Sequence, residues 1–240
     1  MEAITENISN VGGSSMAKLK SRSIGALALI GGVTSIGLAP LLVSIKYLTG
    51  WAIIPEPFWV AAVNELLAAA LPGMTPAELW RSVGTMYSVS LLLMLVGLFA
   101  LRPQLTGGPM AQQTGYWMLV GGLALVLPGD AIHSWTWHQN GLTIPTPGSN
   151  PVANTAYAAH MMGMNFVMGG SLLVGITALR RRTLARWLGW LFALVFPAAL
   201  LASLALLPTT PSGALWLFSV LMGTCGYLLA RGREARLAAI

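Results

Sequence analysis

The sequence predicts an all-α protein, a polytopic transmembrane helical bundle, and its composition is the first reason. Of 240 residues, 55% are hydrophobic and only 8% are charged, and the mean hydropathy is +0.71. An ordinary soluble domain carries about 25% charged residues. So few charges cannot cover a water-facing surface, which excludes a soluble enzyme and a disordered chain. The single cysteine, Cys225, excludes a disulfide scaffold within the chain.

Long apolar runs are the second reason, because a helix needs about 20 mostly apolar residues to cross a bilayer. Six runs meet that requirement: 24–45, 80–101, 116–137, 156–179, 187–207 and 214–230. A seventh run, 58–71, is shorter and contains Asn64 and Glu65. We expect this run to form a short interfacial or re-entrant helix on the outer side. The predicted count is therefore about six spans, with seven as the alternative.

The distribution of lysine and arginine is the third reason and also gives the orientation. With six spans and a cytoplasmic N-terminus, eleven of the thirteen basic residues fall on the inner side. This bias is typical of cytoplasmic loops, and a seventh span would split the two terminal basic clusters. The sequence thus predicts a multi-pass protein of the cell (inner) membrane with cytoplasmic N- and C-termini. Residues 1–23 would be a flexible tail, 24–230 a single bundle domain, and 231–240 a basic tail.

The second span has a recognisable helix start. Thr75-Pro76-Ala77-Glu78 fits a capping box with proline at the first helical position. This pattern predicts that the span begins at the outer surface. It also gives Glu78 a structural role, as part of the helix cap.

The third span contains Pro128-Gly129-Asp130, which allows two interpretations. If the helix begins near Tyr116, it must continue past Pro128 to cross the bilayer, and Asp130 then lies in the outer third of the membrane. If the helix begins at Pro109, it crosses by Leu127, and Asp130 belongs to a solvated turn. We favour the first interpretation, because Gln112 and Gln113 suit an early start poorly.

His160 in the fourth span is expected at the depth of Asp130. The Pro/Gly-rich loop before Asn150 covers the outer end, and Asn150-Pro151 is typical of a helix start. Counting from the helix ends places both side chains roughly 12–14 Å below the outer boundary. Asp130 and His160 can therefore meet if their helix faces agree, and they are the candidate catalytic residues.

The fourth span also carries polar residues and methionines at helical spacing. Tyr157, His160, Met161, Met164, Asn165 and Met168 fall on one helical face. Together with the aromatic residues near the outer ends, they suggest a ligand pocket. The predicted ligand-binding residues are Tyr157, Trp135, Trp137 and Asn165.

Three kinds of chemistry fit these residue types. A metal such as copper could be bound by His133, His160, Asp130 and Met164, and haem is a further possible cofactor. Asp130 and His160 could act as an acid–base pair on a lipid-soluble substrate. A quinone, lipid or isoprenoid could instead bind through His160 and the aromatic rings. These residue types are compatible with a ligand-binding site and with a catalytic site.

Structural explanations compete with each of these. Asp130 and His160 could simply hold two helices together, methionines commonly fill cores, and tryptophans form interfacial belts. The predicted partners are the lipid bilayer and either an apolar small molecule or membrane subunits of a larger complex, in which this chain would be non-catalytic. Nucleic acid is not expected, because the basic residues flank the apolar runs and form no stripe.

Overall fold

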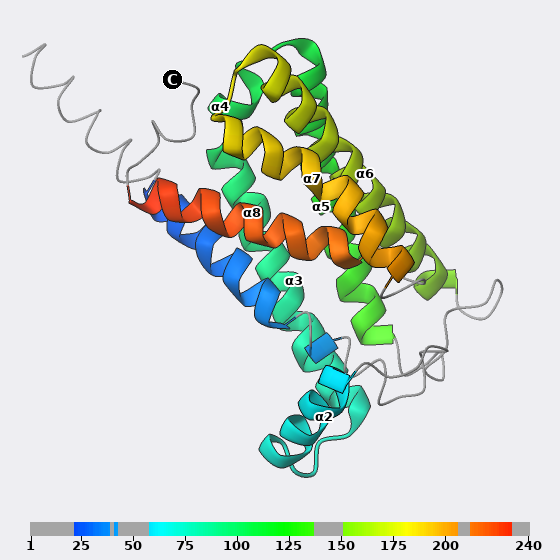
Figure 1. Cartoon of the computed structure of the whole chain (residues 1–240). Coiled ribbons are helices and arrows are strands. Elements are labelled where there is room, and N and C mark those ends of the chain that lie inside the picture. The colour runs from blue at the N-terminus through cyan, green and yellow to red at the C-terminus, as the bar shows by residue number, and fades with distance from the viewer. Residues whose placement is uncertain (1–21, 39–40, 43–57, 137–150, 206–211, 232–240) are drawn as a thin grey trace, which may run out of the picture.

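The computed structural model describes residues 22–38, 41–42, 58–136, 151–205 and 212–231 (Figure 1). These residues form helices and turns with no β-strand among them, which confirms the all-α prediction. Residues 1–21 and 232–240 of the predicted tails, the loop 137–150 and Trp137 lie outside the described residues, whereas residues 22 and 23, predicted as part of the tail, belong to the N-terminal helix.

Eight helices are described. The N-terminal helix, Arg22–Leu38, is followed by α2 (Phe58–Ala70), α3 (Pro76–Ala100), α4 (Arg102–Thr106), α5 (Met110–Thr136), α6 (Pro151–Arg181), α7 (Arg186–Ala205) and α8 (Ser212–Ala230). Three described segments are long and apolar enough to cross a membrane: Ala77–Ala100, Met110–Ile132 and Pro151–Arg181. The N-terminal helix and the described apolar parts of α7 and α8 are shorter.

The start of α3 confirms the predicted capping box. The backbone N–H of Thr75 donates to Glu78 Oε2 at 2.9 Å, and the N–H of Glu78 donates to Thr75 Oγ1 at 3.3 Å. Two N–H groups that the helix leaves without internal acceptors are thereby satisfied. α3 therefore begins at the residue that the sequence indicates.

Each interpretation of the third span is half right. α5 begins early, at Met110, and it also continues through Pro128 to Thr136, a length of about 40 Å. The objection to an early start fails because buried Gln112 has partners: its Oε1 accepts a hydrogen bond from Thr183 at 2.6 Å, and its Nε2 donates to the Gln104 carbonyl at 3.4 Å. The early start and the continuation through Pro128 are therefore compatible.

α5 and α6 pack antiparallel along a stripe of small residues, the glycine seam. Its members are Gly115, Gly122 and Gly129 of α5 and Ala156, Gly163 and Gly170 of α6, which meet as Gly115–Gly170, Gly122–Gly163 and Gly129–Ala156. A Cβ placed on Gly122 would lie 2.7 Å from the Gly163 carbonyl oxygen, so only glycine fits without a shift. The seven-residue spacing on each helix is two turns, which keeps the small residues in one line.

The N-terminal helix lies between α3 and α8 (Figure 1). A Cβ on Gly32 would lie 2.6 Å from the backbone of Gly223 in α8, and one on Gly31 would lie 2.7 Å from the Ser90 carbonyl in α3. Helix α7 covers α6, because the backbones of Gly175 and Ala193 meet closely. Along each of these contacts, the residue numbers rise on one helix where they fall on the other. The neighbouring helices are therefore antiparallel.

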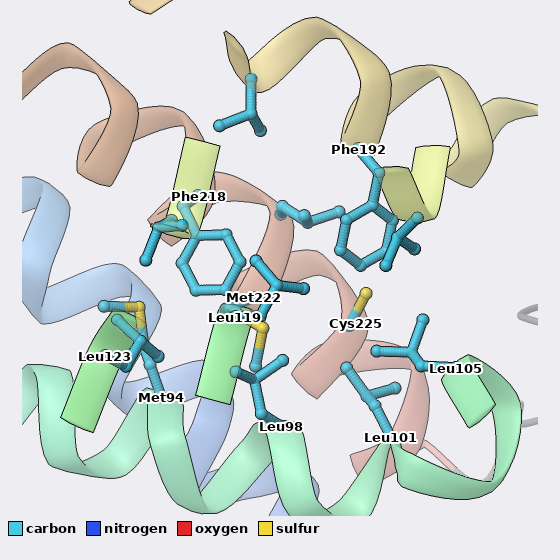
Figure 2. Packing of buried hydrophobic residues seen from close by; sticks show 14 of the residues in the cluster. Met94, Leu98, Leu101, Leu105, Leu119, Leu123, Phe192, Phe218, Met222 and Cys225 are labelled. Atoms are coloured by element: carbon cyan, nitrogen blue, oxygen red, sulfur yellow. The ribbon is translucent and has the colours of Figure 1, made fainter. Parts of the chain in front are cut away.

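A single apolar core joins α3, α5, α7 and α8. Figure 2 shows Met94 and Leu98, Leu119 and Leu123, Phe192, and Phe218 and Met222 pointing toward one another from these four helices, and all are fully buried. The core fixes the relative positions of the helices that carry the candidate site.

Helix α2 packs at the end of the bundle where α3 begins (Figure 1). Its Leu67 is buried against Leu79, Trp80 and Val83 from the first turns of α3. Its thirteen residues extend only about 20 Å, short of the roughly 30 Å hydrocarbon core. This length fits the predicted interfacial or re-entrant helix and not a seventh span.

Candidate functional site

Asp130 lies inside the bundle and contacts α3. Its side chain is only 8% exposed, and its Oδ2 lies 2.8 Å from the hydroxyl of Ser88. Ser88 also lies 3.0 Å from the Gly84 carbonyl one turn earlier, so its single proton is shared between two acceptors. Asp130 is therefore a buried acid in an apolar span, and the solvated-turn interpretation is wrong.

Ser134 extends this contact by one helical turn. It is 1% exposed, and it lies against Gly84 so closely that a Cβ there would overlap its hydroxyl. Among the described residues, Ser134 Oγ has no hydrogen-bond partner. Asp130 and Ser134 share one face of α5 because they are four residues apart, and that face packs on Gly84 and Ser88 of α3.

Tyr87 connects this group to two further helices. Its buried hydroxyl is hydrogen-bonded to Ser35 of the N-terminal helix and is close enough to Asp130 to interact with its charge. Ser35 in turn accepts a hydrogen bond of 2.9 Å from Ser219 of α8. We name Tyr87, Ser88, Asp130 and Ser134 the outer polar cluster, because they lie toward the α2 end of the bundle.

His160 lies on α6 where that helix crosses α5 beside Asp130. A Cβ placed on Gly129 would lie 2.8 Å from the backbone nitrogen of His160, so the two backbones touch there. His160 is half-buried and lies within about one helical turn of the level of Asp130. Gly129 occupies the contact with α6, whereas Asp130, the next residue, sends its Oδ2 to α3.

The remaining predicted ligand-binding residues are spread over different surfaces. Tyr157 is half-buried near His160, and Trp135 is 59% exposed on the outside of α5. Asn165 is exposed, and its amide donates to the Met161 carbonyl of its own helix at 3.0 Å. The structure thus places Tyr157 and His160 near Asp130, and it turns Asn165 and Trp135 outward.

The predicted metal set is only partly described. No three histidine, cysteine, aspartate or glutamate side chains come close enough to hold a metal ion within the described ranges. The side chain of His133, one of the predicted ligands, is outside the described set. Met164 is fully buried and belongs to the apolar core. Copper and haem binding stay predictions.

Sequence reasoning missed the serines and the tyrosine of this site. The available signal was two i, i+4 pairs, Gly84 with Ser88 and Asp130 with Ser134, each presenting small or polar groups on one helix face. Isolated serines in spans commonly donate to their own helix, so one serine alone is a weak signal. The pairing of the two motifs only becomes visible when α3 and α5 are placed side by side.

Comparisons with known proteins give no lead: no family model, no curated protein and no solved structure matches this chain. The function is therefore inferred from the outer polar cluster and its surroundings.

Proposed function

We propose that this chain is a multi-pass protein of the cell (inner) membrane with six spans and both termini in the cytoplasm. The antiparallel contacts of the N-terminal helix, α3, α5, α6, α7 and α8 support this topology, since each successive helix reverses direction. Exposed arginines gather where α3 and α6 end and α5 and α7 begin: Arg102, Arg180, Arg181, Arg182 and Arg186. The described part of the chain carries no exposed arginine cluster of this size toward the other end, where Arg81 lies near the start of α3.

We propose further that the outer polar cluster binds the polar head of an apolar small molecule, such as a lipid, an isoprenoid or a quinone. A buried carboxyl group in a membrane helix is costly, and such groups are functional by default. The observation that carries the proposal is Ser134, a fully buried hydroxyl without a described partner, one turn from the buried Asp130.

A purely structural role explains only part of this cluster. Ser88 links α3 to α5 through Asp130, and that contact suits helix association. A buried hydroxyl left unsatisfied costs about 1–3 kcal/mol, and the Ser134 hydroxyl contributes no described contact that offsets this cost. A bound oxygen-bearing group that accepts from Ser134 and interacts with Asp130 accounts for both residues.

The surroundings fit an apolar ligand with one polar end. Half-buried His160 and Tyr157 flank the cluster from α6 and can contribute a hydrogen-bonding imidazole and an aromatic face. If the bound molecule is also transformed, Asp130 and His160 are the groups suited to move a proton. Binding is the minimal function, and catalysis would be an addition to it.

Extraction of the purified protein tests the proposal. The wild type in mild detergent should release close to one apolar molecule per chain into organic solvent, measured by mass spectrometry. Asp130→Asn and His160→Ala should each lower this occupancy about tenfold or more, because the first removes the carboxyl group's acidity and charge and the second removes the imidazole, each worth about 1.5 kcal/mol or more.

Met168→Leu is the matched control, because Met168 is half-buried on α6 and the exchange conserves volume. Its occupancy should equal that of the wild type. The proposal is wrong if all four proteins release the same molecules in the same amounts. It is also wrong if the wild type releases none and co-purifies with stoichiometric membrane subunits.

A further inference from the structure

The opposite end of the bundle carries a groove on the outside of α5 and α6. Its volume is about 480 Å³, and it is lined by Met110, Gln113, Thr114, Trp117, Met118 and Gly121 of α5 and by Phe166 of α6. We name it the basic-end groove. Met110 and Trp117 are more than half exposed, so the groove opens outward and not toward the core.

Positive charge lies at the mouth of this groove. The guanidinium of Arg102, at the start of α4, is 5.7 Å from the centre of the Trp117 ring, which lines the groove. The hydrogen bond from Thr183 to Gln112 brings the end of α6, with its exposed Arg180, Arg181 and Arg182, to the same end. The acids of the described chain, Glu65, Glu78 and Asp130, lie toward the other end.

The groove matches a lipid of one leaflet in its length and in the order of its polar and apolar residues. From Met110 to Gly121 it extends about 16 Å along α5, which is about one leaflet of hydrocarbon. Its polar members Gln113 and Thr114 and the neighbouring Arg102 lie near the helix start, and Met118, Gly121 and Phe166 lie deeper.

We infer that the basic-end groove binds one anionic phospholipid. Its phosphate pairs with Arg102, and one acyl chain runs along Trp117 and Met118 to Gly121 and Phe166. An arginine held over an aromatic ring at the bilayer surface suits a phosphate headgroup, and basic residues at the cytoplasmic side attract anionic lipids. A purely apolar occupant would leave the charge at the mouth without a role.

Gly121 offers a way to fill the groove without disturbing the fold. A Cβ on Gly121 meets no described atom within 4 Å, whereas a Cβ on the next residue, Gly122, collides with the backbone of α6. Gly121→Leu should therefore occupy the space of the acyl chain and leave the glycine seam intact.

Native mass spectrometry of the full chain, with phosphatidylglycerol or phosphatidylcholine added to the detergent, tests the inference. The wild type should retain one phosphatidylglycerol in preference to phosphatidylcholine. Arg102→Gln should reduce that preference about fivefold, the effect of one basic residue at a membrane surface. Gly121→Leu should abolish retention of both lipids.

Two matched controls use the same substitutions elsewhere. Arg231 also lies over an aromatic ring, 5.4 Å from that of Tyr227, but it is remote from the groove, so Arg231→Gln should leave the preference unchanged. Gly37 likewise has open space around its Cβ, and Gly37→Leu should not affect retention. If Gly121→Leu lowers the unfolding temperature, the smaller Gly121→Val replaces it.

The inference is overturned if the wild type retains both lipids equally, if Arg102→Gln and Arg231→Gln act alike, or if the folded Gly121 variant still retains lipid. It is independent of the proposed function at the outer polar cluster. Asp130→Asn should leave phosphatidylglycerol retention unchanged, so failure of one proposal does not imply failure of the other.

Discussion

Helix α5 joins its two main neighbours in different ways. Toward α6 it presents the glycine seam, in which backbones touch through small residues at a regular seven-residue spacing. Toward α3, at its outer end, it presents Asp130 and Ser134 against Ser88 and Gly84. The contact with α6 thus uses small residues alone, whereas the contact with α3 also uses buried polar groups.

Two typical energies are relevant to the contact between α5 and α3. Hydrogen bonds between membrane helices contribute only about 0.6 kcal/mol on average. A charged side chain at the centre of a membrane helix costs about 2.5–3.5 kcal/mol on insertion scales. On the α3 side, the described contact is the hydrogen bond from Ser88 to Asp130, and the Ser134 hydroxyl adds none among the described contacts.

The largest effect on stability is expected in the glycine seam. Gly122→Leu forces a side chain into the Gly163 carbonyl, which a Cβ alone would approach to 2.7 Å, so α5 and α6 must separate. The free energy of unfolding, measured in mixed micelles, should fall by about 3 kcal/mol or more. Gly121→Leu, on the adjacent residue that faces open space, is the control and should change it by less than about 0.5 kcal/mol.

If both variants lose the same stability, the glycine seam is not what joins α5 and α6.

A smaller effect is expected at Ser88. Ser88→Ala removes the 2.8 Å hydrogen bond to Asp130 and should lower the free energy of unfolding by about 1 kcal/mol. Ser90→Ala is the matched control two residues along α3, because its hydroxyl bonds Thr34 at 2.8 Å on a different interface. The two variants should lose similar stability, and only Ser88→Ala should lower the occupancy of the extracted molecule. A loss above 3 kcal/mol for Ser88→Ala alone would show that the polar contact holds the helices.

Much of the fold could be predicted from local sequence. The helical class follows from composition and apolar runs, and the start of α3 follows from Thr75 and Glu78, which are three residues apart. The early start of α5 was the disfavoured alternative, because the partner of buried Gln112 is Thr183, 71 residues away. A glutamine in an apolar run looks unfavourable until its distant partner is known.

The site was harder to predict for a geometric reason. Adjacent residues of a helix point about 100° apart, so when Gly129 faces α6, the next residue, Asp130, can also reach a second neighbouring helix. Sequence order suggested the consecutive helix α6 as a neighbour of Asp130, but it gave no indication of the hydrogen bond from Ser88 of α3, 42 residues earlier. The spacing of Gly115, Gly122 and Gly129 was the available signal for the face that α6 covers, and it went unused.

Ser134→Ala has the smallest expected effect on stability and separates ligand binding from helix packing most directly. The substitution deletes a buried hydroxyl that has no described partner, so the free energy of unfolding without ligand should stay constant or rise by up to about 1 kcal/mol. The occupancy of the extracted molecule, measured on the same preparation, should fall several-fold. Unchanged occupancy, or a loss of stability comparable to that of Ser88→Ala, would contradict a ligand site at the outer polar cluster.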